Sequence, residues 1–338
     1  MKCAKLVDIG KIEIVEIEEP QITDPMDVLV KVKAVGICGT DLHIFKEGRA
    51  DVQFPRIMGH ELSGEVIGVG PAVTRVAVGD KVALDPVFAC GECPTCKKGH
   101  PNVCSNVKCY GVQMDGGYQE KIVVTEDHLY KFGSGVSYED AALAEPFSIA
   151  SNILHRAGLE SGENVLIIGA GTIGLSILQV AKMKGAVVMV SDVIPQKLAL
   201  AEELGADVVV DNRGKDLGAS AKEHFPFGFD VVIDAVGITP LFAESLNYAA
   251  PCARVMCIGF DGRPAEFPPA MITRKELSII GSRMNNRRFP EVMEWFNQDL
   301  LNTGSMITKR KKIDEIQEAF EETLSDSAGS VKTLILFD

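Results

Sequence analysis

Apolar and polar positions alternate along the first part of the chain. The runs KIEIVEI (11–17) and VLVKVKAV (28–35) follow this two-residue period, and GGYQEKIVV (116–124) is similar. Successive side chains of a strand point to opposite faces, so this period predicts strands with one buried face. No helical period appears in residues 1–35, and we expect a β-rich opening.

The pattern changes at Asn164. Val165–Ile168 is wholly apolar, as a strand buried on both faces requires. Apolar residues then recur at helical spacing as far as Gly185, and a second apolar run leads to Asp192. Pro195 suits the first turn of the next helix, which should end at Gly205. Further apolar runs occupy 207–211, 229–237, 253–260 and 276–283. Six strands joined by helices predict an α/β fold, a doubly wound parallel sheet.

The last part of the chain reads differently again. Segments 289–301 and 313–324 have the spacing of amphipathic helices, and VKTLILF (331–337) predicts a closing strand. The charge runs KRKK (309–312) and EAFEE (318–322) are most simply solvated faces. Residues 141–144 and 149–154 look helical with a break at Pro146, which would leave Glu145 at a helix break in an apolar setting.

A length of 338 residues favours two domains. We place the β-rich domain at 1–149 and 284–338, with a cysteine-rich lobe at 90–104, and the parallel-sheet domain at 150–283. A membrane span over 165–181 is the alternative for the most apolar stretch, but it is too short and too rich in glycine. The formal charge of −13 argues against a general nucleic-acid or anionic-membrane surface. No signal-peptide pattern opens the chain, and we expect a cytoplasmic protein.

Glycines follow the first buried strand in a G-x-G-x-x-G pattern, which predicts a dinucleotide site. Gly169 permits the turn, Gly171 lets the backbone approach a pyrophosphate, and Gly174 lets the helix pack closely on the strand. The free N–H groups at this helix start favour phosphates. Asp192, about 20 residues further on, is placed to accept a hydrogen bond from a ribose 2′-hydroxyl. A buried helix with packing glycines is the alternative.

Nine cysteines in a cytoplasmic chain make a poor disulfide framework. Four of them are clustered with two-residue and seven-residue gaps: Cys90, Cys93, Cys96 and Cys104. Four thiolates on one loop predict a closed, structural Zn²⁺ site. Reduced buried thiols and an iron–sulfur cluster are the alternatives.

The other five cysteines include Cys38, which follows an apolar strand 22 residues before His60 and Glu61. Cysteine, histidine and carboxylate are ligand types that Zn²⁺ takes. Taken alone, a residue such as Cys38 or His60 more often has a structural role.

In combination, these motifs are identified as those of the zinc-dependent medium-chain alcohol dehydrogenases. The G-H-E-x-x-G run at 59–64, the four-cysteine lobe and the glycine fingerprint occur in this order in that family, and the resemblance covers essentially the whole chain. The chain looks most similar to the polyol and sugar-acid branch, with sorbitol and threonine dehydrogenases. ELSIIGSR (276–283) and AALAEPFSIA (141–150) look most like bacterial galactonate or gulonate 5-dehydrogenases.

The resemblance implies a GroES-like catalytic domain beside the Rossmann domain, and roles for particular residues. Cys38 and His60 match catalytic zinc ligands. Glu145 stands where simple alcohol dehydrogenases have a third cysteine and the polyol branch has glutamate. Glu61 matches an acid that approaches the metal in some members, and Asp41 an acid that contacts a ligand. Thr40 and His43 match proton-relay positions. The four clustered cysteines match the structural zinc lobe, which makes two Zn per chain, and the family suggests dimers or tetramers.

The implied reaction oxidises a secondary alcohol of a sugar acid or polyol to a ketone. The metal stabilises the alkoxide of a bound substrate hydroxyl, and the alkoxide passes a hydride to nicotinamide C4. Asp192 would repel a 2′-phosphate, which favours NAD over NADP. Lys197 can pair with Asp192 or contact the ribose. Arg283 can contact the cofactor or a substrate carboxylate, or lie on the surface. The remaining expected cofactor contacts are Ala170, Thr172 and Ile173 in the glycine loop, and Ala235, Ile258, Gly259, Phe260 and Ser282 at later strand ends.

Three other interpretations remain. A threonine or other alcohol dehydrogenase of the same family would keep both zinc sites. A non-catalytic NAD-binding regulator would keep only the structural zinc, and a zinc-free reductase of the same fold, such as a quinone reductase, would keep neither. The presence of Cys38, His60 and Glu145 argues against the last two.

Overall fold

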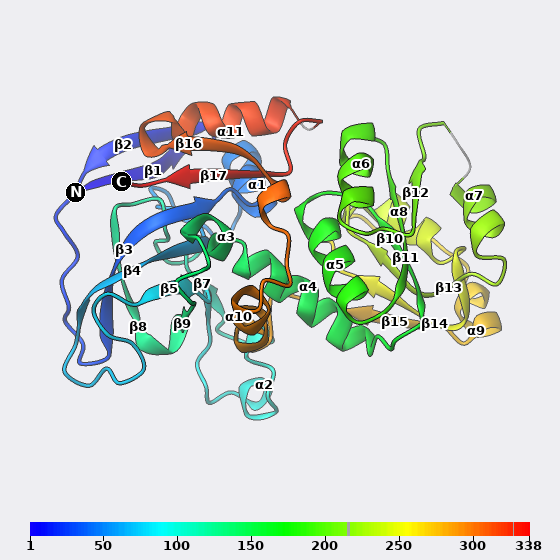
Figure 1. Ribbon diagram of the computed structural model, residues 1–338, viewed down its shortest axis with the longest axis horizontal. Helices are drawn as coiled ribbons and strands as arrows, with labels where there is room; N and C mark the ends of the chain where they lie inside the picture. Colours follow the sequence, from blue (N-terminus) through cyan, green and yellow to red (C-terminus); the bar gives the residue numbers. More distant parts are fainter. Residues whose placement is uncertain (215–216, 327) are drawn as a thin grey trace. The chain divides into compact units, whose positions relative to one another are not determined.

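The computed structural model describes residues 1–214, 217–326 and 328–338. The chain divides into two compact units, which Figure 1 draws in sequence colours. The first is formed by Met1–Glu145 and Asn285–Asp338, and the second by Pro146–Met284. The boundary between them falls inside helix α4 (Ala144–Ala157). Each unit is described below by itself.

The first unit is built on a seven-stranded sheet with the order β16-β17-β3-β4-β5-β9, in which β8 also pairs with β3. All of its pairings are antiparallel except β16 with β17. Two-stranded pairs, β1 with β2 and β6 with β7, accompany it. The strands are β1 (Lys2–Asp8), β2 (Lys11–Glu16), β3 (Asp27–Gly36), β4 (Glu61–Val69), β5 (Lys81–Leu84), β6 (Val87–Phe88), β7 (Lys108–Cys109), β8 (Lys121–Thr125), β9 (Leu129–Lys131), β16 (Ile307–Lys312) and β17 (Lys332–Leu336).

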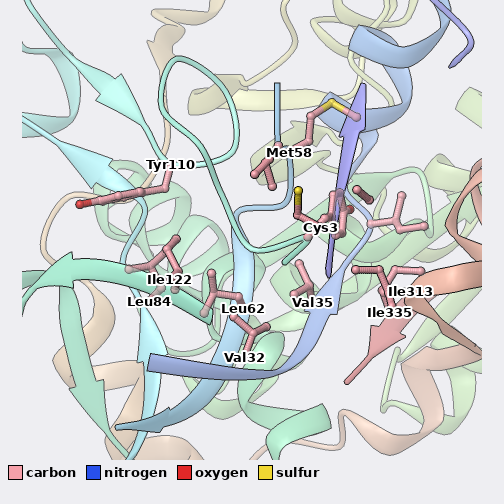
Figure 2. Packing of buried hydrophobic residues seen from close by; sticks show 14 of the residues in the cluster. Cys3, Val32, Val35, Met58, Leu62, Leu84, Tyr110, Ile122, Ile313 and Ile335 are labelled. Atoms are coloured by element: carbon pink, nitrogen blue, oxygen red, sulfur yellow. The ribbon is translucent and has the colours of Figure 1, made fainter. Parts of the chain in front are cut away.

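Short helices connect these strands. They are α1 (Gly39–Glu47), α2 (Pro94–Lys97), α3 (Tyr138–Ala142), α10 (Phe289–Asn297) and α11 (Ile316–Ser325), with 3₁₀ turns at Pro101–Val103, Glu126–His128, Gly304–Met306 and Ile313–Glu315. The apolar alternation of the sequence explains the core, because the inward positions of separate strands meet on one side of the sheet. Figure 2 shows Cys3 of β1, Val32 of β3, Leu62 of β4 and Ile335 of β17 in this cluster. Ile316, Ala319 and Phe320 add the apolar face of α11 to it.

The second unit is a six-stranded parallel sheet with the order β12-β11-β10-β13-β14-β15. Strand order reverses beside β10, as it does in a doubly wound nucleotide-binding sheet. The predicted α/β architecture is therefore confirmed. The elements are β10 (Asn164–Ile168), α5 (Thr172–Met183), β11 (Val187–Asp192), α6 (Pro195–Glu203), β12 (Val208–Asp211), α7 (Leu217–His224), β13 (Phe229–Asp234), α8 (Thr239–Ser245), β14 (Ala249–Cys257), α9 (Ala270–Lys275) and β15 (Ser278–Gly281).

Two local predictions are wrong. Pro146 does not break a helix, because it lies in the first turn of α4, where its missing N–H has no helical partner to lose. The interruption instead falls at Leu143, between α3 and α4. Glu145 thus belongs to the first turn of a helix.

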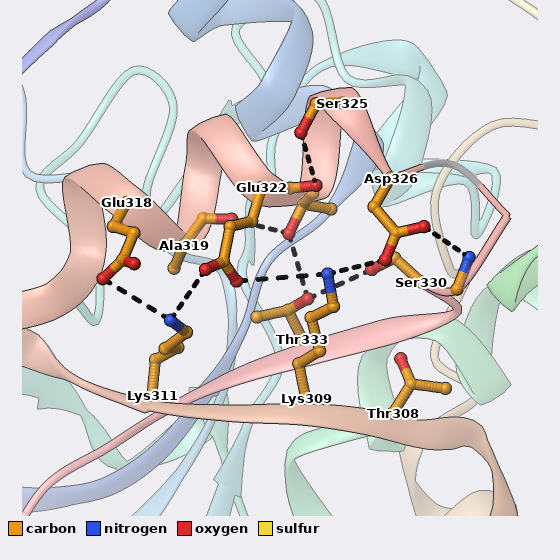
Figure 3. Close-up of polar contacts among 12 residues, drawn as sticks. Thr308, Lys309, Lys311, Glu318, Ala319, Glu322, Ser325, Asp326, Ser330 and Thr333 are labelled. Atoms are coloured by element: carbon orange, nitrogen blue, oxygen red, sulfur yellow. Dashed lines mark hydrogen bonds and ion pairs between the residues drawn. The ribbon is translucent and has the colours of Figure 1, made fainter.

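The charge runs at 309–312 and 318–322 are not simply solvated faces. Figure 3 shows them facing each other, with β16 under α11. Lys309 Nζ lies 3.0 Å from Asp326 Oδ2, and Lys311 Nζ lies 3.1 Å from Glu322 Oε1 and 3.5 Å from Glu318 Oε2. The side chains of the two lysines are only 22% and 17% exposed. The two lysine side chains are therefore largely covered, and their ammonium groups pair with the acids.

No helix in the described part of the chain combines the length and the apolar character needed to cross a membrane.

Candidate functional site

A cluster of metal-ligand side chains lies at one edge of the sheet in the first unit. Strand β3 ends at Gly36 and β4 begins at Glu61, and these two residues are paired in the ladder. Cys38 and His60, just beyond those strand ends, therefore lie beside Glu61. One ligand atom from each of Cys38, His60 and Glu61 lies within 4.8 Å of the others.

Asp41 supports this cluster from α1. Its Oδ2 accepts hydrogen bonds from the Cys38 N–H at 3.0 Å and the Tyr118 hydroxyl at 3.1 Å. Its Oδ1 lies 3.5 Å from His60 Nδ1, and both atoms are buried without a hydrogen-bond partner among the described residues. Burial lowers the pKa of His60, but the charges of Asp41 and Cys38 raise it well above its ordinary value. A carboxylate facing Nδ1 leaves Nε2 as the nitrogen available to a metal.

Glu61 has a second neighbour that sequence reasoning missed. Lys332, the first residue of β17, places Nζ 2.6 Å and 2.9 Å from the two Glu61 carboxylate oxygens, and it also donates to Ile37 O at 3.1 Å. Both side chains are 2% exposed. Burial lowers the pKa of Lys332, while the charge of Glu61 raises it, and the net direction is upward. A single lysine before an apolar strand carries no signal of such a partner.

Glu145 is buried close to the same cluster but is not one of the three residues that it brings together. Burial raises the pKa of its carboxyl group to about 7, the charges of His60 and Lys332 oppose this rise, and Glu61 adds to it. These mutual effects require Glu145 to lie within electrostatic range of the cluster. A buried carboxyl group of this kind favours a cation partner.

The expected relay residues both lie on α1. Thr40 is half-buried in the first turn, and His43 stands one helical turn further on the same face. The His43 side chain is 56% exposed, and its Nδ1 lies 3.7 Å from Glu47. His43 is thus in contact with solvent, and its role as a proton acceptor stays a prediction.

The four clustered cysteines converge around α2. The Cys93 Sγ lies 3.5 Å from the Cys96 Sγ and 3.8 Å from the Cys104 Sγ. The Cys104 Sγ lies 3.4 Å from the Cys90 Sγ. All four are free thiols within 4.8 Å of one another. Zn–S bonds of about 2.3 Å in a tetrahedron require sulfurs about 3.8 Å apart. Backbone N–H groups lower the pKa of Cys93 to about 5, so this loop already stabilises a thiolate. The donor set fits a structural zinc.

The glycine loop of the second unit has the geometry that its sequence predicts. Gly169 has φ of +103°, in the region that disfavours side chains, and a Cβ on Gly174 would lie 1.9 Å from Gly169 O. By contrast, a Cβ on Gly171 would meet no atom within 4 Å, so space is open at the start of α5. Asp192 Oδ2 accepts from the Ala170 N–H at 2.6 Å, which fixes its carboxylate beside the loop. Thr172 and Ile173 open α5 itself.

The other expected cofactor contacts follow strand ends of the same sheet. Ala235 donates its N–H to Ile168 O at 2.8 Å, and Ser282 donates to Cys257 O at 3.0 Å. Ile258 and Gly259 follow β14, and Phe260 is 80% exposed. The Arg283 guanidinium lies 5.9 Å from the centre of the Phe260 ring. Lys197 forms no ion pair with Asp192 or with any other described residue, so that suggested pairing is absent.

These observations define the class of protein to which the chain belongs. A β-rich unit with a Cys–His–Glu cluster and a four-cysteine loop, in one chain with a doubly wound nucleotide-binding sheet, is the construction of a two-domain, metal-dependent dehydrogenase. Family models agree with this class. Residues 24–134 match the alcohol dehydrogenase GroES-like domain, and residues 172–298 match the zinc-binding dehydrogenase domain. The chain belongs to the zinc-binding alcohol dehydrogenase family.

Relatives of known name extend over almost the whole chain. The starvation-sensing protein RspB of Escherichia coli is 36% identical over 98% of this chain and 99% of its own. The D-altritol 5-dehydrogenase of Agrobacterium fabrum is 35% identical, with 97% of each chain covered, and the L-galactonate-5-dehydrogenase of E. coli is 31% identical, with 92% of each covered. A crystal structure of the alcohol dehydrogenase rspB from E. coli CFT073, complexed with NADH, superposes with a TM-score of 0.95 at 35% identity and covers 100% and 99% of the two chains. The resemblance to this enzyme family is confirmed.

Proposed function

We propose that this protein catalyses the reversible oxidation of a secondary alcohol, in a polyol or sugar acid, to a ketone, with NAD⁺ as the hydride acceptor. The observation that carries the proposal is the convergence of Cys38, His60 and Glu61 at one buried sheet edge, with all three ligand atoms within 4.8 Å. Thiolate, imidazole and carboxylate form a donor set suited to a catalytic zinc.

The residues that would hold this zinc are Cys38 and His60 with a carboxylate from Glu145 or Glu61. Zinc bound there supplies a Lewis acid that lowers the pKa of a substrate hydroxyl. Asp41 orients the His60 ring through the 3.5 Å approach to Nδ1. Lys332 holds Glu61 by an ion pair, so it competes with a metal for that carboxylate and favours Glu145 as the resting ligand.

Proton release is assigned to α1. Thr40 and His43 lie one turn apart on the helix that begins beside Cys38, and His43 reaches solvent. A hydroxyl and an imidazole at this spacing can pass a proton from a buried site outwards. His43 would take the proton at a ring nitrogen, with Glu47 stabilising the imidazolium ion.

The loop at 169–174 and the residues that follow the later strands would bind NAD, which accepts the hydride at its nicotinamide ring. The open space at Gly171 and the free N–H groups of α5 suit a pyrophosphate. Asp192 suits a ribose 2′-hydroxyl and repels a 2′-phosphate, which favours NAD over NADP. Among the described residues, Lys197 forms no ion pair with Asp192, so it does not neutralise this carboxylate. The Arg283–Phe260 pair lies at the same ends of the sheet and is the proposed contact for the nicotinamide half or for the substrate.

The substrate class rests on two of the relatives named above, the D-altritol 5-dehydrogenase and the L-galactonate-5-dehydrogenase. Both D-altritol and L-galactonate present a secondary alcohol within a chain of hydroxyl groups. The four cysteines of the 90–104 loop would hold a second zinc with no open position, so its role is to stabilise that loop.

Metal content and NADH formation on the same preparation test the proposal. We expect about two Zn per chain and NAD⁺ reduction with at least one member of a panel of polyols, hexonates, threonine and simple secondary alcohols. Cys38→Ser should abolish turnover and leave Trp295 fluorescence unchanged, whereas Cys252→Ser, at an exposed thiol, should keep activity. Full activity of Cys38→Ser would refute the catalytic assignment. Two Zn with turnover of threonine alone would keep the mechanism and refute the substrate class.

A further inference from the structure

A further acidic residue, Asp85, lies near the sheet edge that carries the cluster. Strands β4 and β5 pair antiparallel, with Ser63 opposite Ala83. Continued by two residues, this register brings Asp85 opposite Glu61. Adjacent strands lie about 5 Å apart, so the two backbones are close neighbours at this edge. Asp85 directly follows β5, so this extension of the register places it beside the cluster, next to the start of β4.

The Asp85 carboxylate is held by one oxygen only. Its Oδ1 accepts hydrogen bonds from Asn285 Nδ2 at 2.9 Å and from the Val87 N–H at 3.1 Å. His128 fixes the backbone, because its carbonyl accepts from the Asp85 N–H at 2.8 Å and its Nδ1 lies 2.9 Å from Asp85 O. Asn285 is 2% exposed. Among the residues that the structure describes, no donor lies within hydrogen-bond distance of Oδ2.

The surroundings of Asp85 connect it electrostatically to the proposed metal site. Burial raises the pKa of Asp85, although the residue is not fully enclosed. Its charge adds to the rise in the pKa of Glu145. Burial raises the pKa of Cys109 to about 12, with smaller effects from His60, Glu145 and Asp85, so the Cys109 thiol lies in range of all three. Asp85 and the cluster are therefore within electrostatic range of one another in the first unit.

We propose that Asp85 Oδ2 accepts a hydrogen bond from a substrate hydroxyl next to the carbon that is oxidised, and that it selects a neutral polyol segment at this position. An ionised carboxylate is acceptor-only, so it pairs with a hydroxyl group and offers nothing to an alkyl group. It also repels a carboxylate or phosphate group, and Glu61 and Glu145 add to that repulsion. This inference rests on the proposed oxidation of a polyol or sugar acid, and in a sugar acid it requires the carboxylate to lie away from Asp85.

Asp85→Asn tests this inference, because the amide keeps the shape and can still accept from Asn285. We expect kcat/KM for 2,3-butanediol or D-sorbitol to fall about 10- to 100-fold, mostly through KM, because a hydrogen bond to a charged acceptor is replaced by a neutral one. For 2-butanol, which lacks the neighbouring hydroxyl, the change should stay below about 2-fold. Asp314→Asn, at an exposed ion pair with Lys2, is the matched control and should leave all substrates unaffected. Equal losses for 2-butanol and 2,3-butanediol would overturn the inference and leave Asp85 a purely structural role.

A binding measurement separates this inference from the proposed function. Calorimetric titration of D-sorbitol and galactitol into the zinc-loaded protein with NADH should show weaker binding to Asp85→Asn than to the wild type, by about the same factor as kcat/KM. If the wild type binds polyols more tightly than Asp85→Asn does but oxidises no substrate of the panel, the inference would be supported and the proposed reaction refuted. Absence of polyol binding to the wild type, or equal binding to both proteins, would overturn the inference whatever the kinetics.

Discussion

Replacement of Lys332 by Met tests how strongly the buried charges of the site depend on each other. Lys332 and Glu61 are each 2% exposed, and their charged atoms lie 2.6 Å apart. Met has a stem of similar length and no charge, so the substitution mainly removes the ammonium group. Glu61 would then keep a buried negative charge without its partner, and the Ile37 carbonyl would lose its donor.

The loss of one partner from a buried ion pair costs about 3–5 kcal/mol, most of it from the charge left behind. We therefore expect Lys332→Met to destabilise the first unit by about 3–5 kcal/mol. In the double variant Lys332→Met/Glu61→Gln, most of this loss should be recovered, because no unpaired charge remains. Zinc loading should reduce the loss in the single variant, since a cation near Glu61 can replace the ammonium group.

The assay is denaturant unfolding followed by tryptophan fluorescence. The sequence has a single tryptophan, Trp295 of α10, which lies in the first unit, so its signal reports on that unit. Lys2→Met is the matched control. Lys2 Nζ lies 2.9 Å from Asp314, but these side chains are 43% and 57% exposed, and we expect no measurable shift in the unfolding midpoint. If Lys332→Met shifted the midpoint no more than Lys2→Met, Glu61 would not be a buried charge and the electrostatic account of the site would fail.

Two further predictions concern the metal sites and pH. After chelation of zinc, Cys93 should be the first thiol alkylated by iodoacetamide near pH 6–7, because its pKa is lowered to about 5. Cys109, with a pKa of about 12, should resist alkylation. Peptide mapping by mass spectrometry checks this order, and rapid labelling of Cys109 would contradict it. In metal-free protein, Glu145 binds its proton more tightly when folded, at a pKa of about 7, than when unfolded, so it disfavours folding increasingly as pH rises from about 4.5 to 7. Glu145→Gln should therefore gain stability over the wild type across that range, by up to about 3 kcal/mol in pH-dependent unfolding, and a difference that stays constant with pH would refute the shift.

The alternation of apolar runs with helical periods was sufficient to predict the second unit. A parallel sheet buried on both faces needs strands that are apolar throughout, and Val165–Ile168 and Ala186–Val190 have that character. Local signals also worked where one residue type decides the conformation, as with Pro195 at the first position of α6. Pro146 was misread because a proline in a first turn and a proline that breaks a helix differ only in where the helix begins.

Pairings between distant segments could not be predicted. Lys309 and Lys311 meet Glu318 and Glu322 because β16 lies under α11, which no local pattern records. Lys332 is separated from Glu61 by 271 residues, and a lysine beside an apolar strand is normally exposed. Sequence spacing found Cys38 and His60 because their residue types are unusual in that setting, whereas Asp85 and Asn285 are ordinary polar residues whose position alone makes them significant.

The order of strands explains why these particular residues meet. Strands β17, β3, β4 and β5 are neighbours in the sheet, and the residues at or just beyond their ends meet at one edge. In the order of the strands, these residues are Lys332, Cys38, Glu61 and Asp85. The ladders that align them pair Leu334 with Gly36, Gly36 with Glu61, and Ser63 with Ala83. A slip of one residue in any ladder would turn the following side chain to the other face. Gly36 is required at the centre, since a Cβ there would lie 2.1 Å from Glu61 Oε2. The register of the sheet therefore places one cationic group, Lys332, beside several acidic ones. The proposed zinc would balance the negative charge that remains around Cys38, His60 and the carboxylates.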